Sequence, residues 1–283
     1  MKTAIITDST CDLGPAGEIA YQIDIVPLLV AFGENVYRDS ADMTSEEFYR
    51  QLSKATSLPK TSQPAPATFK EVFRRRLDEG KDIVGLFISS CLSGTYQAAA
   101  LARSGFSEEE QNRIFLVDSL LGSGALGLLV LDACAMRDQG ISAAEIREKI
   151  SRLIPRVKLY AIFDTLKYLR LGGRISATAA VAGGILNIVP IITVQGGKIE
   201  VVAKIRKSAN TFRKWLRETI NKELPDAQHP IVYLHSNNLT QITSLQEEFK
   251  YLTSPEKTYR LSLGAVIGTH AGPGAYGMVY VTR

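Results

Sequence analysis

Residues 82–106 read "DIVGLFISSCLSGTYQAAALARSGF", a β-branched apolar run, a hydroxyl-rich turn and then an alanine-rich segment. The apolar run is typical of a strand that is buried on both faces, and residues 93–106 are typical of a helix. A strand buried on both faces has helices packed on either side, as in parallel sheets. This stretch therefore predicts one strand–helix unit of a parallel α/β sheet.

The same alternation fills the first half of the chain. Further strands are predicted at residues 3–9, 24–32 and 113–119, which read "TAIITDS", "DIVPLLVAF" and "RIFLVDS". Helices are predicted at residues 44–55, 67–80 and 124–140. Repeated strand–helix units favour a parallel sheet between two helical layers. We therefore predict a parallel-sheet α/β/α domain over residues 1–156.

The second half of the chain has a different order of predicted strands and helices. Pro155 ends a helix before a new strand and marks the predicted boundary. Strands are predicted at residues 159–164, 188–205 (a hairpin around Gly196 and Gly197), 230–236, 256–264 and 277–282, and helices at 208–224 and 238–252. Hairpins mixed with helices predict a second α/β domain, with a mixed sheet, over residues 157–283.

The composition is typical of a globular protein, because 45% of the 283 residues are hydrophobic and 22% are charged. The opening "MKTAIITDST" lacks the apolar segment of a signal peptide. The most apolar later stretch, residues 178–194, is interrupted by Gly183, Gly184, Asn187 and Pro190. We therefore expect a cytoplasmic protein with no membrane span.

The three cysteines have neither the number nor the spacing of a disulfide framework or a metal site. Cys11 and Cys134 lie beside apolar residues and are expected to be small buried hydrophobic side chains. The role of Cys91, within "SSCLSGT", stays open. No metal site is predicted.

Charge is unevenly distributed along the chain. Residues 1–156 contain 17 Lys and Arg against 21 Asp and Glu, whereas residues 157–283 contain 16 against 8. Between Lys158 and Arg217 there are 11 basic residues and two acidic ones. Such a cluster is typical either of a surface for an acidic or anionic partner or of a solvated basic face. Nucleic acid is not expected, because no helix-turn-helix, zinc-finger or RNP-type pattern accompanies the charge.

Hydroxyl groups follow the predicted strands of the first half. Ligands of parallel sheets bind beyond the carboxyl ends of the strands. Those ends read Asp8–Thr10, Ser89–Thr95 and Asp118–Ser119. We therefore expect a small-molecule site built from these three segments.

A dinucleotide site is a weaker interpretation. Gly122, Gly124 and Gly127 have the spacing of a dinucleotide fingerprint between a strand and a helix. Residues 138–150, however, lack the second strand whose acidic end would bind the ribose. Tight packing of the strand against the helix explains these glycines better.

Ser93 allows two interpretations. A serine hydrolase or acyltransferase with Ser93 as nucleophile and His270 as base stays an alternative, although the nucleophile motif would require a glycine at Cys91. The interpretation that we favour is that Ser93, Gly94 and Thr95 open a helix and direct hydroxyl and N–H groups toward an anion.

Two further segments hold polar side chains in restricted backbone. The loop "SLPKTSQPAPATF" contains Thr61 and Ser62 between prolines. Residues 266–282, "VIGTHAGPGAYGMVYVT", place His270 among glycine, alanine and proline. This second composition predicts a tight turn at His270 before a last strand.

Five motifs occur in the order and spacing of the DegV family: "DSTCDL", "TSQPAPATF", "SSCLSGTYQ", "LKYLRLGGRIS" and "GTHAGPGAYG". The chain resembles this family over essentially its whole length. DegV proteins are bacterial fatty-acid-binding proteins that serve a fatty acid kinase. The resemblance implies two α/β lobes with a fatty acid between them and its carboxylate at the mouth of the pocket.

By this resemblance, Thr61 and Ser93 correspond to hydrogen-bond donors for the carboxylate, and His270 to a histidine near the head group. The expected ligand-binding set also contains Ser62, Gly94 and Thr95. Arg170, Arg174 and Arg206 resemble basic positions used for structure or for docking the kinase subunit.

The implied function is to bind a long-chain fatty acid and to present its carboxylate to a separate ATP-dependent kinase, which forms an acyl phosphate for phospholipid metabolism. Alone, the chain is expected to have no enzymatic activity and no cofactor. Transient contact with a membrane is compatible with a lipid ligand. Residues 25–32 and 175–187 are expected to supply small or flexible apolar pocket walls.

Overall fold

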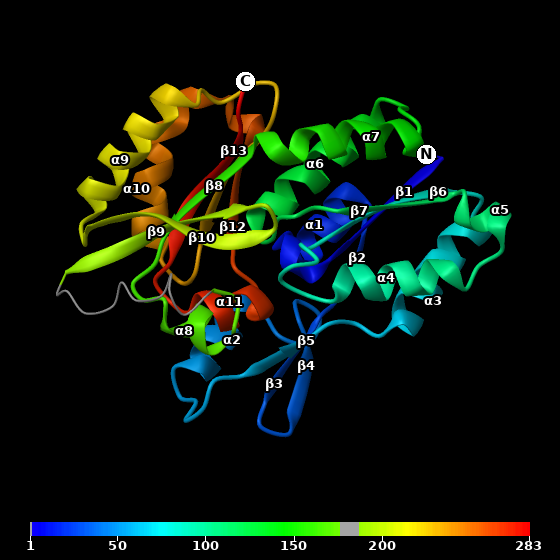
Figure 1. The fold of residues 1–283 in the computed structure, drawn as a ribbon, viewed down its shortest axis with the longest axis horizontal. Coiled ribbons are helices and arrows are strands. Elements are labelled where there is room, and N and C mark those ends of the chain that lie inside the picture. The colour runs from blue at the N-terminus through cyan, green and yellow to red at the C-terminus, as the bar shows by residue number, and fades with distance from the viewer. Residues whose placement is uncertain (1, 176–186) are drawn as a thin grey trace.

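The computed structural model describes residues 2–175 and 187–283 (Figure 1). Within these ranges the chain forms a four-stranded sheet, a six-stranded sheet and a three-stranded sheet. The two larger sheets lie on opposite sides of the molecule, and helix α6 (Gly124–Asp138) packs against both of them. The smallest sheet lies below them in this view.

The four-stranded sheet is parallel and has helices on both faces, as predicted. Its order is β2 (Asp24–Val26), β1 (Thr3–Asp8), β6 (Asp82–Phe87) and β7 (Ile114–Asp118). Helices α3 (Pro66–Asp78) and α4 (Thr95–Ser104) cover one face, and α6 and α7 (Ala143–Leu153) cover the other. Ile6 packs with Phe69 in the first layer, and Ile5 with Leu126 in the second. Adjacent residues of one strand thus enter different cores, which explains the continuously apolar sequence.

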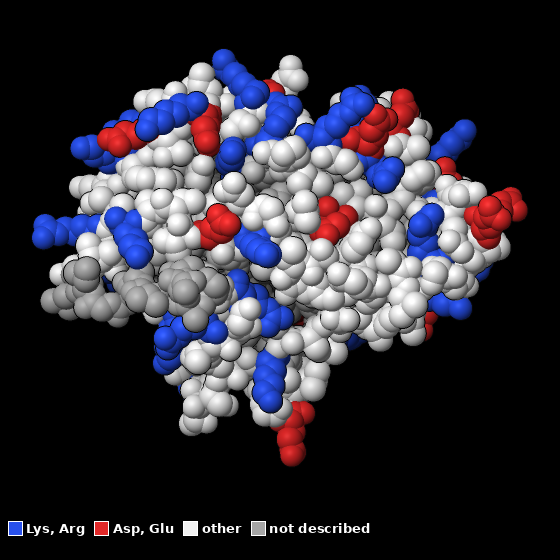
Figure 2. Space-filling view, in the orientation of Figure 1, with Lys and Arg blue, Asp and Glu red and all other residues white. Residues whose placement is uncertain are grey.

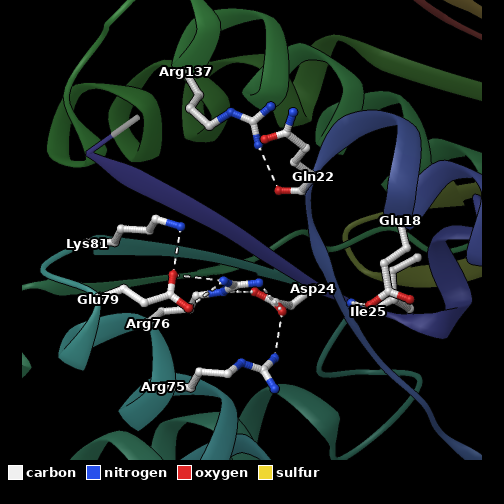
Figure 3. Close-up of polar contacts among 9 residues, drawn as sticks. All are labelled: Glu18, Gln22, Asp24, Ile25, Arg75, Arg76, Glu79, Lys81 and Arg137. Carbon is white, nitrogen blue, oxygen red and sulfur yellow. Dashed lines mark hydrogen bonds and ion pairs between the residues drawn. The ribbon is translucent and has the colours of Figure 1, made fainter.

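The edge strand β2 is tied to α3 by a cluster of ion pairs (Figure 3). Asp24, whose side chain is 8% exposed, accepts hydrogen bonds from Arg76 Nε at 2.6 Å and Nη2 at 2.7 Å, and from Arg75 Nη2 at 2.7 Å. Glu79 and Lys81 extend the cluster outward. A bidentate arginine pair at a mostly buried carboxylate fixes geometry more firmly than an exposed pair. The arginine-rich end of α3 therefore stabilises the packing of this helix against the edge strand.

The prediction of a single strand over residues 24–32 is wrong. The segment divides at Pro27 into β2 and β3 (Leu29–Phe32), which belong to different sheets. Proline has no N–H for a continuing ladder, so the chain leaves the parallel sheet there. Strand β3 pairs in antiparallel fashion with β4 (Asn35–Arg38) and β5 (Lys60–Ser62). Helix α2 (Ser45–Leu52) shares a small hydrophobic core with this sheet.

The six-stranded sheet is mixed, as predicted. Its order is β10 (Lys198–Arg206), β9 (Ile188–Gln195), β8 (Val157–Ile162), β13 (Tyr276–Val281), β11 (Ile231–His235) and β12 (Thr258–Ser262). The pairing of β11 with β12 is parallel and the others are antiparallel. One face is covered by α9 (Ala209–Lys222) and α10 (Leu239–Phe249), and the other packs against α6.

The remaining short helices connect these layers. They are α1 (Gly14–Tyr21), α5 (Glu108–Gln111), α8 (Lys167–Leu171) and α11 (Ala265–Ala271), with single 3₁₀ turns at Ser9–Cys11, Ile154–Arg156, Lys250–Leu252 and Pro255–Lys257. Helix α7 ends immediately before the turn that contains Pro155. The division of the chain into domains at residue 156 stays a prediction, since α6 shares one hydrophobic core with strands of both large sheets.

Candidate functional site

A cavity of about 330 Å³ lies between the two large sheets and reaches the small third sheet. This size falls within the range of about 300–1,000 Å³ that is common for small-molecule sites. Its walls are mainly apolar and include Leu159, Ala161, Ile192, Val194, Ile199 and Leu234. Its polar groups come from Thr61, Ser62, Gln63, Ser93, Ser123, Arg174 and His270. The arrangement suits a ligand with a long apolar part and one polar end.

Five of the six predicted ligand-binding residues line this cavity: Thr61, Ser62, Ser93, Gly94 and His270. Thr61 Oγ1 lies 2.9 Å from His270 Nε2, although the two residues are 209 positions apart in sequence. Ser93 precedes α4, whose N-cap is Gly94, as predicted. The fold thus brings segments from three distant parts of the chain to one cavity.

Thr95 does not line the cavity. It is fully buried, its Oγ1 lies 2.8 Å from Ser93 Oγ, and its N–H donates to the same oxygen at 3.3 Å. Thr95 therefore orients Ser93 from behind. Because Ser93 is engaged with Thr95, and His270 Nε2 with Thr61, the nucleophile–base hydrogen bond of a serine hydrolase does not form between the described positions of Ser93 and His270.

The prediction of a tight turn at His270 is wrong, because His270 lies in the last turn of α11. The neighbouring glycines serve close packing. A Cβ on Gly268 would lie 2.6 Å from Phe48 Cε1, and one on Gly272 would lie 2.3 Å from Tyr168 Cδ2. Gly272 also has φ +70° and ends the helix. Glycine is a poor helix former, so tertiary packing overrides the local preference here.

The environment keeps the His270 ring neutral at pH 7. Burial, with a smaller contribution from the positive charge of Arg174, lowers the pKa of His270 to about 4. Its Nδ1 is buried and has no hydrogen-bond partner within residues 2–175 and 187–283. The ring therefore offers one free nitrogen beside the nitrogen that contacts Thr61.

Three buried aspartates hold the segments around the cavity. Asp12 accepts hydrogen bonds from the Gly264 N–H at 2.9 Å and from Ser123 Oγ at 2.7 Å. Asp39 accepts from the Ala265 N–H at 2.8 Å, so both carboxyls bind the start of α11. Asp8 accepts from the Ile88 N–H at 2.8 Å, at the end of β6. Burial raises the pKa of Asp12 to about 8 and the pKa values of Asp8 and Asp39 to about 6.

The prediction that three strand ends build the site needs correction. Of these three segments, only the one after β6 lines the cavity. Asp8, Ser9 and Thr10 are buried beneath it, and Asp118 accepts hydrogen bonds from the N–H groups of Ser90 and Leu120. Residues with polar side chains at strand ends therefore support the loops here. Sequence reasoning missed Gln63 as a residue that lines the cavity. Its side chain packs against Gly94, where a Cβ would lie 2.1 Å from Gln63 Oε1.

The three arginines occupy different places. Arg174 lines the cavity and donates to the carbonyls of Leu92 and Gly172. Arg170 on α8 and Arg206 at the end of β10 are exposed. Figure 2 shows Lys and Arg side chains over α8 on this face.

The structure also places the three cysteines and part of the predicted pocket walls. Cys11 and Cys134 are buried, whereas Cys91 is exposed. Leu28, from the predicted wall 25–32, lines the cavity. In the predicted wall 175–187, Ile175 is buried in the main core, and residues 176–186 lie outside the described residues.

Neither a metal site nor a transmembrane segment is found in the described part of the chain. No group of three or more His, Cys, Asp and Glu side chains within residues 2–175 and 187–283 is arranged to hold a metal ion. None of the helices in these ranges is long and apolar enough to cross a membrane.

Comparison with known proteins gives a consistent assignment. A family model described as "Uncharacterised protein, DegV family" matches residues 2–283. A DegV domain-containing protein of Caldanaerobacter subterraneus subsp. tengcongensis is 33% identical over 279 residues, which are 99% of this chain and 98% of that protein.

Two solved structures agree with this result. A fatty-acid-binding DegV family protein from Thermus thermophilus has a TM-score of 0.89 and 30% identity, over 100% of both chains. DegV of Bacillus subtilis, a fatty acid binding protein, has a TM-score of 0.84 and 29% identity, also over 100% of both chains. Since the family model covers all but the first residue, this chain belongs to the DegV family.

Proposed function

We propose that the chain binds a long-chain fatty acid in the cavity between the two large sheets. The carboxylate lies at the end formed by Thr61, Ser93 and His270, and the acyl chain lies against the apolar walls. The observation that carries the proposal is a cavity with mainly apolar walls in which Thr61 Oγ1 and His270 Nε2 lie 2.9 Å apart. The fatty-acid binding of the Thermus and Bacillus relatives supports it.

The apolar part of the ligand dominates the binding free energy. Burial of an acyl chain contributes about 0.8 kcal/mol per CH₂, so roughly fourteen methylenes contribute on the order of 11 kcal/mol. The hydroxyls of Thr61 and Ser93 then orient the carboxylate and satisfy its acceptors. Because His270 is neutral, the carboxylate is the one charged group at that position, and uncharged hydrogen-bond donors surround it.

We also propose that the bound carboxylate is presented to a separate ATP-dependent kinase. Arg170 and Arg206 are exposed, and neither forms an ion pair with a carboxylate among the described residues. Such side chains suit the steering of an acidic protein surface toward the cavity. The family resemblance supports this role, which leaves the chain itself a binding protein without catalysis.

The first expected result concerns the bound lipid. Protein purified under native conditions should release a long-chain fatty acid on organic extraction, as identified by mass spectrometry. After delipidation, added palmitate should raise the melting temperature, because a ligand at 100 times its Kd stabilises the folded state by about 2.7 kcal/mol. Acetate, which has the carboxylate alone, should have no effect. Protein that carries no lipid and gains no stability from palmitate would contradict fatty-acid binding.

The second expected result concerns the head group. Thr61→Val should weaken palmitate binding about ten-fold or more, since a hydrogen bond to a charged group contributes about 1.5 to 3 kcal/mol. Binding of 1-hexadecanol, which has no charge, should change less. The control is Thr56→Val, an exposed position in the preceding loop. Equal losses for both lipids in Thr61→Val would show that Thr61 shapes the cavity and does not recognise the carboxylate.

A further inference from the structure

The hairpin of β9 and β10 reaches from the six-stranded sheet toward the four-stranded one (Figure 1). Strand β9 pairs with β10 along its whole length. Its described pairing with β8, on the other side, covers only Ile191 and Ile192. Residues 193–200 therefore project beyond β8 as a two-stranded ribbon.

The ribbon forms part of the wall of the apolar cavity. Val194 and Ile199 are cross-strand partners, and both line this cavity. Ile199 also lines a second cavity, of about 620 Å³, together with the exposed residues Lys198 and Glu200. Ile199 thus stands between the apolar cavity and a space with charged walls. Movement of the ribbon would join the two.

The tip of the ribbon packs against the four-stranded sheet. Its turn consists of Gly196 and Gly197, whose φ angles are +55° and +82°. Gly197 is buried, although hairpin tips normally lie in solvent, and its carbonyl accepts a hydrogen bond from Ser89 Oγ at 2.8 Å. A Cβ on Gly197 would lie 3.1 Å from Cys91 Sγ and 3.3 Å from Leu120 Cδ2. The loops after β6 and β7 therefore hold the tip.

The two ends of the ribbon are attached with different strength. At its base, the strands continue into the six-stranded sheet, and a β-bulge shifts the register between Val201 and Ala203. Bulges bend and twist a strand, and a two-stranded ribbon has little stability of its own. At the tip, the Ser89–Gly197 hydrogen bond is the one that joins residues 193–200 to the four-stranded sheet within the described part of the chain. The tip is thus the end that can detach.

We propose that the ribbon is a strap that opens to let the fatty acid enter and leave the apolar cavity. It pivots at the bulge when the Ser89–Gly197 hydrogen bond breaks, and Val194 and Ile199 then move away from the acyl chain. In the closed position these side chains keep water from the chain. The inference rests on the proposed function, because it assigns a route to the ligand of that function. The docking of the tip then sets the rate of lipid exchange.

A reversible crosslink between the tip and the loop after β6 tests this inference. In Gly197→Cys the new Cβ would lie 3.1 Å from Cys91 Sγ, close to the separation of about 3 Å between a Cβ and the partner sulfur of a disulfide. The variant is loaded with radiolabelled palmitate and oxidised with diamide, and release to excess albumin is followed. Release should be at least ten-fold slower than from the same variant reduced with dithiothreitol. The strain of a side chain at positive φ is common to both forms.

Gly197→Ser is the control for the crosslink, since it has a similar shape and no thiol, and Cys11 and Cys134 are buried. Its release rate should not depend on the oxidant. A second variant, Ser89→Ala, removes the hydrogen bond at the tip. It should release palmitate about five-fold faster than the wild type, the effect of roughly 1 kcal/mol. Ser151→Ala removes a similar hydrogen bond on α7, outside the cavity, and should release palmitate at the wild-type rate.

The outcomes separate the two proposals. Equal release from the oxidised and reduced forms, with the disulfide confirmed by mass spectrometry, would show that the fatty acid leaves by another route, and fatty-acid binding would stand. If the disulfide does not form, a wild-type release rate in Ser89→Ala leads to the same conclusion. If the wild-type chain does not bind palmitate, the proposed function itself is wrong.

Discussion

Replacing Ala161 by phenylalanine is expected to reduce palmitate binding about 100-fold or more. Ala161 is 1% exposed, lies in the middle of the six-stranded sheet on β8, and lines the cavity between the two large sheets. A phenyl ring at this position would occupy space that the acyl chain needs. Exclusion of only four methylenes, at about 0.8 kcal/mol each, already removes about 3 kcal/mol of binding free energy.

The measurement is a titration of the delipidated variants with fatty acids of increasing length. The loss in Ala161→Phe should grow with chain length, because the ring shortens the space available and leaves the head-group end unchanged. Val36→Phe, at a position that is 59% exposed on β4, adds a similar ring outside the cavity and should bind like the wild type. Undiminished palmitate binding by a folded Ala161→Phe variant would place the lipid elsewhere.

The large sheets follow from sequence patterns because those patterns are local. A run such as residues 82–90 is apolar on both faces, and this property alone requires a helix on each side. The hairpin around Gly196 and Gly197 is likewise specified by adjacent residues, and it joins β9 to β10 as predicted. A pattern within a few adjacent residues was sufficient to predict both features.

The parts that sequence reasoning missed depend on contacts between distant segments. Helix α11 forms despite its glycine content, because Phe48, Tyr49 and Tyr168 pack closely against it. The meeting of Thr61 with His270 joins positions 209 residues apart, and no local pattern specifies it. The family motifs predicted both residues for one site, and the structure brings their side chains into contact, whereas their role in ligand binding stays a prediction.

The aspartates are a second case in which a local sequence pattern does not identify the role of a residue. Asp8 ends the parallel strand β1 and Asp12 lies shortly after it, where a carboxylate is often a ligand or a catalytic group. Here both are buried beneath the cavity and bind backbone N–H groups of other segments. Asp39 adds a third carboxyl directly after β4, and its charge makes a small contribution to the raised pKa values of Asp8 and Asp12, which burial raises most. Only the tertiary structure distinguishes such supporting carboxyls from ligand-binding ones.

Asp12→Asn is expected to make the stability of the delipidated chain less dependent on pH between 6.5 and 8. Burial raises the pKa of Asp12 from 3.8 in the unfolded chain to about 8, so the folded chain binds more protons in this range. The free energy of unfolding of the wild type therefore falls as pH rises from about 4 to about 8, by about 1.4 kcal/mol per pH unit where Asp12 alone differs.

The choice of window matters because His270 acts in the opposite direction. Burial lowers the pKa of His270 to about 4, so the unfolded chain binds the extra proton between pH 4 and 6.5, and this contribution stabilises the folded state as pH rises. Asp8 and Asp39, whose raised pKa values are about 6, have lost most of their contribution by pH 6.5. Above that pH, Asp12 is the buried aspartate of the three that still titrates.

Urea unfolding of delipidated protein at pH 6.5 and at pH 8 provides the measurement. The wild type should lose about 2 kcal/mol more than Asp12→Asn between the two values, from about 1.4 kcal/mol per pKa unit. Asparagine keeps an acceptor for the Gly264 N–H, so the start of α11 is retained. The control is Asp42→Asn, since Arg38 lowers the pKa of Asp42 to about 2 and keeps it ionised throughout the window. Equal slopes for the wild type and Asp12→Asn would show that Asp12 is already ionised at pH 6.5, and that its hydrogen bonds from Gly264 and Ser123 outweigh its burial.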